Sequence, residues 1–198
     1  MAIIVDKVQK RKNIALSCKK LIFIHGIKDL TISKIAKTAG VGKGTIYEYF
    51  TNKEDIVFEI VNILVDERSK KMERKLAKIN STKEKIKYFS RFFYSDEDME
   101  LRKLYKEFIS IALSSPNEKM IQFQTESFIS HYEWFEKIIQ DAIDSGEIIK
   151  KSAPLTKGLF VTAEGMFISS VATNAIDDIQ KELDDYIDSI FDLIEVKY

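Results

Sequence analysis

Lysine, threonine and tyrosine side chains occur at alternate positions in one short stretch, at Lys43, Thr45 and Tyr47. All three donate hydrogen bonds and lysine adds a positive charge, which suits them to phosphate oxygens and base edges. The stretch lies within residues 1–50, which carry ten Lys/Arg and three Asp/Glu, a net charge of +7. Residues 81–198 carry 14 bases and 22 acids, a net charge of −8. Such an asymmetry is typical of a basic module that faces nucleic acid, although a solvated lysine-rich surface is an equal alternative on charge alone.

Residues that could catalyse a reaction or bind a metal are few. The chain has two histidines, His25 and His131, and one cysteine, Cys18. No pair has metal-ligand spacing, and the chain has no glycine-rich phosphate loop and no nucleophile elbow. Cys18 and His25 fall on the apolar stripe of a predicted helix, where we expect packing roles. The sequence therefore predicts no enzyme, no metal site and no cofactor.

The cellular location follows from the cysteine count and from the apolar segments. A single cysteine excludes an internal disulfide and suits a reducing compartment. The apolar run at residues 1–5 is too short for a signal peptide. The longest nearly uncharged stretch, residues 158–175, contains Glu164 and is shorter than the roughly 20 apolar residues of a membrane span. We expect a cytoplasmic protein that does not contact a membrane.

The elements that position the functional residues are predicted to be helices throughout. Only 2 prolines and 7 glycines interrupt the chain, and no segment combines a strand pattern with a turn. Apolar residues recur at spacings of three and four, which is typical of amphipathic helices. The predicted helices cover about residues 8–24, 31–39, 43–50, 52–78, 81–93, 95–113, 116–145, 154–171 and 178–195. The predicted fold class is all-α.

The two short helices within residues 31–50 have the pattern of a helix-turn-helix. Gly40 marks the turn, and Thr31 is the predicted N-cap of the first helix. Small residues at the predicted crossing allow close approach, and Ile35, Ile46 and Phe50 fill the space beneath. In such a motif the second helix enters the major groove of DNA. An incidental helical hairpin in a bundle is the alternative, but the basic surroundings favour DNA binding.

The same stretch resembles the DNA-binding signature of the TetR family of repressors. The resemblance is carried by Ile35-Ala36, Ala39-Gly40-Val41, Gly44-Thr45-Ile46-Tyr47-Glu48-Tyr49-Phe50 and Lys53-Glu54. The match extends from Gly26 to about Arg68, within a family-like region of about residues 8–68. The C-terminal part is similar only in outline, at the Ser145-Gly146-Glu147-Ile148 turn and at Glu164-Gly165.

This resemblance implies a domain organisation and a set of partners. It implies an N-terminal three-helix DNA-binding domain at residues 1–52 and an all-helical regulatory and dimerisation domain at residues 53–198. Residues 53–78 would form the connecting helix, and residues 153–196 the helices of a homodimer. The implied partner is a palindromic operator in double-stranded DNA. The residues implied to contact DNA are Thr31, Lys34, Lys43, Gly44, Thr45, Tyr47 and Lys53.

Each implied contact has a chemical reason. Lys43 and Thr45 would reach base edges or nearby phosphates, while Tyr47 and Lys53 would bind phosphates. Gly44 lacks a side chain, so the DNA backbone could approach it closely. The family often has a hydroxyl residue where this chain has Gly42, so we expect no contact there. The bases Lys7, Lys10, Arg11 and Lys12 could follow a groove, although a solvated helix face is the more frequent role of such a cluster.

Residues 81–175 carry many aromatic side chains on long helices. Ordinary core packing explains most such residues, but a pocket between helices for a small apolar or aromatic ligand is the functional alternative. The candidate pocket residues are Phe92, Phe108, Phe123, Phe128, His131, Tyr132, Phe135, Phe160, Glu164 and Phe167.

Three functions remain in competition at this point. The leading hypothesis is a dimeric repressor in which a bound ligand tilts the helix at residues 53–78 and releases the operator. The alternative is a ligand-independent activator or adaptor that acts through a protein partner. A third hypothesis is an enzyme or structural helical protein with a vestigial helix-turn-helix.

Overall fold

The computed structural model of the 198-residue chain describes residues 6–27, 29–114 and 118–197. Within those ranges the chain is helical, and its only extended pairing is an isolated antiparallel bridge between Ile148 and Glu195. The prediction of an all-α protein is confirmed. No helix in the described ranges combines the length and the apolar character needed to cross a bilayer.

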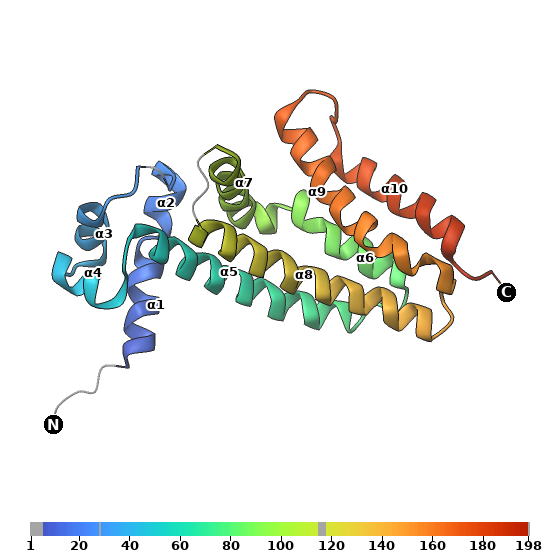
Figure 1. Ribbon diagram of the computed structural model, residues 1–198, viewed down its shortest axis with the longest axis horizontal. Helices are drawn as coiled ribbons and strands as arrows, with labels where there is room; N and C mark the ends of the chain where they lie inside the picture. The colour runs from blue at the N-terminus through green and yellow to red at the C-terminus, as the bar shows by residue number, and fades with distance from the viewer. Residues whose placement is uncertain (1–5, 28, 115–117, 198) are drawn as a thin grey trace. The chain divides into compact units, whose positions relative to one another are not determined.

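The described residues form ten α-helices and three 3₁₀ helices (Figure 1). In chain order these are α1 (Lys7–Ser17), α2 (Lys19–His25), α3 (Ile32–Ala39), α4 (Lys43–Tyr49), α5 (Lys53–Leu76), α6 (Thr82–Ser90), η1 (Arg91–Phe93), η2 (Asp96–Asp98), α7 (Met99–Ser114), α8 (Glu118–Asp144), η3 (Lys150–Leu155), α9 (Thr156–Ala172) and α10 (Ile179–Ile194). They divide into two compact units. The N-terminal unit contains residues 1–70 and 103–116, and the bundle unit contains residues 71–102 and 117–198. The helix-turn-helix therefore belongs to a unit that extends beyond residue 52 and includes parts of α5 and α7.

The N-terminal unit is built around α1, α3 and α4, which pack on one another. Ile14, Ile35, Ile46 and Phe50 are buried where these helices meet, as the sequence pattern predicts for the last three. Phe108 of α7 is also buried and stacks on Phe58 of α5, with ring centroids 6.0 Å apart. The C-terminal half of α7 is thus part of the core of this unit.

The first predicted helix is divided at Cys18 into α1 and α2. The Ser17 hydroxyl donates to the carbonyl oxygen of Ile14, and the Cys18 N–H donates to the carbonyl oxygen of Ala15. Hydrogen bonds of this kind compete with the regular α-helical pattern and bend helices. Cys18 is buried, as expected, but the prediction that His25 lies on the buried stripe is wrong, because His25 is exposed at the end of α2.

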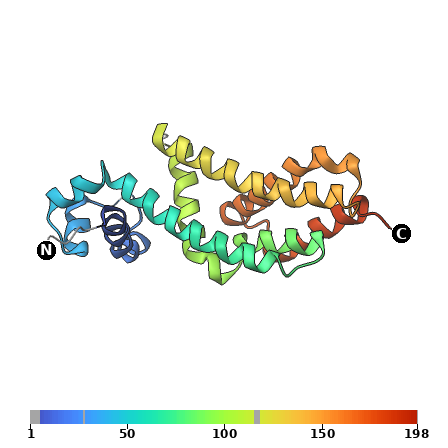
Figure 2. The ribbon, with the colours of Figure 1, turned by 90° about the horizontal axis from the view of Figure 1, so that it is seen from below.

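The bundle unit is a ring of four helices. In this ring α6 packs on α8, α8 on α9, α9 on α10, and α10 returns to α6; Figure 2 shows the long α8 beside α9. The core lies within the ring, and the last turns of α5 add Met72 and Leu76 to it. Phe160 of α9 lies at the centre of an aromatic cluster with Phe89, Phe128, Tyr132 and Phe135.

The turn after α8 closes the bundle unit. Gly146 has φ +77°, the left-handed conformation that glycine adopts without strain. The carboxylate of Glu147 accepts hydrogen bonds from the N–H and the hydroxyl of Thr82, at 2.7 and 2.6 Å. The Ile149 N–H donates to the carbonyl oxygen of Ile194. This turn therefore fastens the start of α6 and the end of α10 together.

Local capping signals explain several helix starts. The Ser81 and Asp178 side chains accept hydrogen bonds from Glu84 and Lys181 main-chain N–H groups. At the start of α5 the Asn52 side chain accepts a hydrogen bond from the Asp55 N–H, and the Asp55 carboxylate accepts one from the Thr51 N–H. The start of the helix predicted at about residues 116–145 lies outside the described residues. Pro154, predicted to begin a helix, lies instead near the end of η3, directly before α9.

Candidate functional site

The residues of the predicted helix-turn-helix form two helices that cross at a tight turn. Gly40 has φ +67°, and the Val41 N–H donates to the Ala36 carbonyl oxygen at 3.0 Å, which together terminate α3. Thr31 accepts from the Lys34 N–H at 3.3 Å and so caps the start of α3. Residues 31–50 are called the reading head below. Its local structure matches the expectation from sequence.

One face of α4 is left open to solvent. Ile46 is completely buried and anchors the helix, whereas Lys43 and Gly44 are exposed and Thr45 is half-buried. The Tyr47 side chain is 60% exposed, although tyrosine usually packs part of its ring. A Cβ atom at Gly44 would meet nothing within 4 Å. The face can therefore present a cation, hydroxyl groups and bare main chain to a macromolecule.

The remaining predicted contact residues lie around this face with hydrogen bonds of their own. Thr31 and Lys34 are exposed at the start of α3, and the Lys34 ammonium donates to the Asp29 carbonyl oxygen at 3.2 Å. Lys53, at the start of α5, is half-buried and donates to the Ile27 carbonyl oxygen at 3.3 Å. A phosphate contact by Lys53 would have to share or replace this bond.

The basic residues of α1 have different roles. Arg11 forms an ion pair with Glu59 at 2.8 Å and donates a hydrogen bond to the Tyr49 carbonyl oxygen. Lys7 and Lys12 are exposed. Arg11 is therefore a structural residue of the N-terminal unit, and only its neighbours remain open to a macromolecule.

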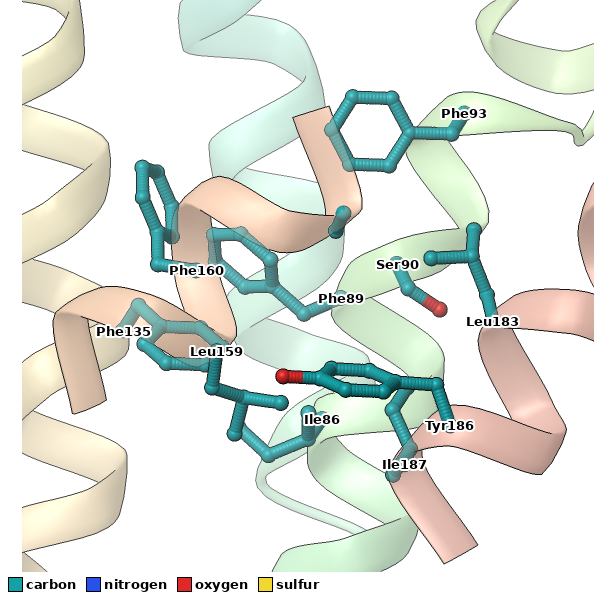
Figure 3. A pocket seen from close by; sticks show the side chains of 11 residues that line it. Ile86, Phe89, Ser90, Phe93, Phe135, Leu159, Phe160, Leu183, Tyr186 and Ile187 are labelled. Atoms are coloured by element: carbon teal, nitrogen blue, oxygen red, sulfur yellow. The ribbon is translucent and has the colours of Figure 1, made fainter. Parts of the chain in front are cut away.

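The bundle unit encloses a small cavity between α6, α8, α9 and α10 (Figure 3). Its volume is about 20 Å³, enough for about one water molecule. The cavity is lined by Ile86, Phe89, Ser90, Phe93, Phe135, Leu159, Phe160, Ala163, Leu183, Tyr186 and Ile187. Apart from two hydroxyl groups this lining is apolar.

The two hydroxyl groups of the cavity differ in how firmly they are bound. Ser90 donates to the Lys87 carbonyl oxygen at 2.8 Å within α6. In Figure 3 the Tyr186 ring lies across the cavity with its hydroxyl directed inward. This hydroxyl donates to Thr162 at 3.5 Å, which is long for an O–H···O bond. Tyr186 is therefore the polar group that could most readily turn to a ligand.

The predicted pocket residues are dispersed. Phe135 and Phe160 line the cavity, while Phe128 and Tyr132 pack against Phe160 from outside its lining. Phe108 lies in the N-terminal unit. The others lie elsewhere in the bundle unit: Phe92 and Phe167 contact Phe93, His131 bonds to the Ser127 carbonyl oxygen, and Phe123 and Glu164 are half-buried.

The predicted pocket residues include only Phe135 and Phe160 of this lining, since periodicity alone does not show which aromatic and aliphatic residues face the cavity. α6 and α10 contribute aliphatic residues to the walls, at Ile86, Leu183 and Ile187, beside the aromatic Phe89 and Tyr186. The useful signal was the presence of small residues, Ser90 and Ala163, among large ones, since a small side chain leaves space in a packed bundle.

Within residues 6–27, 29–114 and 118–197, no group of three or more His, Cys, Asp or Glu side chains could hold a metal ion. Cys18 is buried, and burial raises the pKa of its thiol, an effect that the hydrogen bond with Ser17 opposes. A thiol held in this state is a poor nucleophile at neutral pH.

Comparison with known proteins supports the interpretation of residues 31–50 as a helix-turn-helix. Residues 19–60 match the family described as bacterial regulatory proteins, tetR family. The fatty acid metabolism regulator protein of Bacillus subtilis is 29% identical over 148 residues, which cover 72% of this chain and 73% of that protein.

Solved structures share the fold over nearly the whole chain. A transcriptional regulator from Saccharomonospora viridis in complex with choline has a TM-score of 0.76 and 16% identity, covering 96% of this chain and all of that one. The transcriptional regulator FadR from Bacillus subtilis in complex with stearoyl-CoA has a TM-score of 0.61 and 23% identity, covering 88% of this chain and 94% of that one.

Proposed function

The chain belongs to the tetR family of bacterial regulatory proteins, and from that premise we propose that it is a dimeric repressor which a ligand releases from a palindromic operator. The observation that carries the DNA-binding part is the exposed face of α4. Ile46 anchors that helix in the core, while Lys43, Thr45 and Tyr47 are presented outward. A helix with this division can enter the major groove and keep its packing.

Selection of bound duplexes from a random DNA pool tests this part. The wild-type protein should enrich a palindrome with half-sites about one helical turn apart. The Lys43→Ala/Tyr47→Phe variant should bind the selected duplex more weakly, since both changes remove exposed donors without touching the core. Enrichment of no sequence by a folded wild-type protein would count against the repressor.

The dimer proposal rests on the surface of α9. This helix buries Leu159, Phe160 and Phe167 in the bundle unit, yet Val161, Ile168 and Val171 on its other side are exposed. Gly158 and Gly165 have nothing within 4 Å of an added Cβ, so main chain could approach closely there. Exposed apolar residues that recur along one helix are typical of an interface. A second copy is the proposed occupant, because a palindromic operator requires twofold symmetry.

Sedimentation or light scattering tests the dimer directly. Ile168→Asp should convert the dimer to a monomer and weaken operator binding. Ile24→Asp is the matched control, because Ile24 is also an exposed isoleucine but lies on α2. A wild-type protein that is monomeric at micromolar concentration would exclude the dimer proposal.

For the ligand we favour a long-chain acyl-CoA. Two comparisons support this class: the Bacillus subtilis relative regulates fatty acid metabolism, and the Bacillus subtilis FadR structure contains stearoyl-CoA. The lining of the cavity also suits an acyl chain, since only Ser90 and Tyr186 bring polar side chains to it.

The size of the cavity sets a condition on this proposal. About 20 Å³ is far below the roughly 300–1,000 Å³ of typical ligand sites, so side chains must move apart for a chain to enter. Such an opening could provide the differential affinity on which release depends, because a ligand shifts an equilibrium only by binding one state better. In this proposal α5, which runs from the bundle unit to the reading head, tilts and moves the two reading heads out of register.

Titration of the operator complex with stearoyl-CoA tests the ligand class. Release is expected with stearoyl-CoA but not with coenzyme A or choline. Ala163→Leu should narrow the cavity and reduce release while leaving operator binding intact. If stearoyl-CoA released the Ala163→Leu variant from the operator at the same ligand concentration as the wild type, the ligand would bind outside this cavity.

The small volume of the cavity also favours a second candidate function, a ligand-independent activator or adaptor. A protein of this kind needs no cavity and would present its bundle unit to another protein. Stearoyl-CoA would then change neither the melting temperature nor operator affinity. Operator binding with no response to apolar ligands would favour this candidate.

A further inference from the structure

Glu48 is the one acidic residue of the reading head, which also contains three lysines. It is exposed on α4, and within the part of the chain that the structure describes its carboxylate forms no ion pair. A base three or four residues away stabilises an acid on a helix, but those positions hold a glycine, two threonines and an asparagine. The protein therefore leaves this carboxylate open to another molecule.

The charge of Glu48 does not stabilise the helix that carries it. Glu48 is the last residue but one of α4, where the helix dipole presents its negative end. A negative side chain is unfavourable there, so its replacement by a neutral one should not lower the stability of the protein. Helix stability therefore gives no reason for an acid at this position.

Glu48 lies on the side of α4 that faces away from the core of the N-terminal unit. Successive residues of an α-helix are turned by about 100°, so Glu48 lies about 160° around the helix from Ile46, which is completely buried. Gly44 lies about 160° from Ile46 in the other direction, one turn from Glu48 on the same strip of α4. An added Cβ atom at Gly44 would meet nothing within 4 Å, so the Glu48 side chain does not cover this strip. The strip that DNA could approach most closely therefore carries a carboxylate.

A carboxylate at this position discriminates among bases. DNA phosphates repel it, and an ionised carboxylate can only accept hydrogen bonds. In the major groove cytosine presents a donor, its N4 amino group, whereas guanine and thymine present acceptors. Adenine has a donor at N6, but the N7 acceptor beside it repels a carboxylate. Cytosine is therefore the base that best offsets the repulsion by the phosphates.

We infer that Glu48 is a specificity-determining residue, whose carboxylate accepts a hydrogen bond from the N4 amino group of a cytosine in each half-site of the operator. This inference rests on the part of the proposed function that places α4 in the major groove. Lys43 attracts any duplex through its charge, whereas Glu48 weakens binding to every duplex that lacks a cytosine at the matching position. Affinity and discrimination thus depend on different side chains of one helix.

The first test compares the duplexes that the full chain and its variants select from a random DNA pool. The wild-type protein should enrich cytosine at one position of each half-site. Glu48→Gln should enrich adenine there instead, because a glutamine amide pairs with both N6 and N7 of adenine. Glu48→Ala should enrich no base at that position. An unchanged preference for cytosine in Glu48→Gln and Glu48→Ala would overturn the inference.

Glu67→Gln is the matched control for the change of charge. Glu67 is also an exposed acid of the N-terminal unit, but it lies about 21 Å along α5 from Lys53, the first residue of that helix. This variant should select the wild-type sequence. A change of the selected base in Glu67→Gln equal to that in Glu48→Gln would overturn a direct contact by Glu48.

The second test measures the dissociation constants of two duplexes, the selected one and one in which thymine replaces this cytosine in both half-sites. The wild-type protein and Glu67→Gln should bind the second duplex about tenfold or more weakly than the first. In Glu48→Ala the two constants should agree within about twofold, because the group that distinguishes the bases is absent. A wild-type ratio of the two constants in Glu48→Ala would overturn the inference.

A failure of the proposed function gives a different result in these tests. The wild-type protein and every variant would then enrich no sequence, which would overturn DNA reading by α4 as a whole. If the wild-type protein enriches a palindrome and Glu48→Gln keeps all of its base preferences, only the role of Glu48 is overturned. The melting temperatures of both Glu48 variants should equal or exceed the wild-type value, which separates a lost base preference from unfolding.

Discussion

The guanidinium of Arg11 lies 4.2 Å from the centroid of the Phe50 ring. The same group forms an ion pair with Glu59 and donates to the Tyr49 carbonyl oxygen. Because Tyr49 and Phe50 lie at the end of α4, one side chain of α1 fixes that end of α4 to α5. The orientation of α4 therefore depends on Arg11, a base that lies on α1 and not on the exposed face of α4.

Arg11→Ala should lower the free energy of unfolding by about 1–3 kcal/mol, because it removes a charged hydrogen bond and a cation–π contact together. Urea denaturation measures this change. Lys12→Ala removes an exposed neighbouring base and should have an effect within about 0.5 kcal/mol. Equal effects of the two substitutions would contradict a structural role for Arg11.

Gly44→Ala should affect stability and DNA binding in opposite directions. The new methyl group meets no protein atom within 4 Å, and alanine in place of glycine should stabilise the helix by about 0.5–1 kcal/mol. Operator affinity should fall by about 1–3 kcal/mol, because the methyl group separates α4 from the DNA backbone. Thermal denaturation and fluorescence anisotropy measure the two effects.

Asn62→Ala controls for the gain in helix stability. Asn62 is an exposed residue of α5, so its replacement should stabilise the protein and leave operator affinity unchanged. If Gly44→Ala left operator affinity at the wild-type value, close approach of DNA at Gly44 would be excluded.

Asp188→Asn should destabilise the protein in a pH-dependent way. Its hydrogen bond from Lys87, at 2.7 Å, holds the pKa of Asp188 below its usual value, with Lys83 adding to the effect. A lowered folded-state pKa stabilises the protein above the unfolded value of about 3.9, and this stabilisation is lost as the pH falls through the folded value. The melting temperatures of variant and wild type should thus differ at pH 7 and converge below about pH 4. A difference as large at pH 3 would contradict the ion pair as its cause.

Cys18 should react with maleimide only when the N-terminal unit opens. The side chain is fully buried and burial raises the pKa of its thiol, so both access and thiolate formation are limited. We expect labelling about a hundredfold slower than that of an exposed thiol. The comparison is a Cys18→Ser/Leu113→Cys variant, since Leu113 is 82% exposed. Similar labelling rates would show that α1 and α2 open readily.

The elements that sequence predicted well are those with short-range signals. Thr31 and Gly40 delimit α3 through hydrogen bonds to main-chain groups within five residues, so their identity is sufficient to predict the helix ends. The break at Cys18 has no comparable signal, since serine at position 17 is compatible with an uninterrupted helix.

The cavity could not be predicted, because its walls meet through long-range pairing. Phe123 and Phe135 lie on the same helix and are alike in composition, yet only Phe135 lines the cavity. Which face of α8 turns inward depends on how α6 and α9 pack against it. The hydrogen bond from the Ile27 N–H to Glu107 could not be predicted either, because the two residues are far apart in the chain.

The N-terminal unit is not a contiguous piece of sequence, since it closes only when Phe108 reaches Phe58. A ribosome must therefore synthesise α7 before the N-terminal unit can complete its core. A transplanted fragment that ends at residue 52 would lack both partners of this stack. A chimaera that transfers the reading head to another protein should therefore include both segments of the N-terminal unit, residues 6–70 and 103–114.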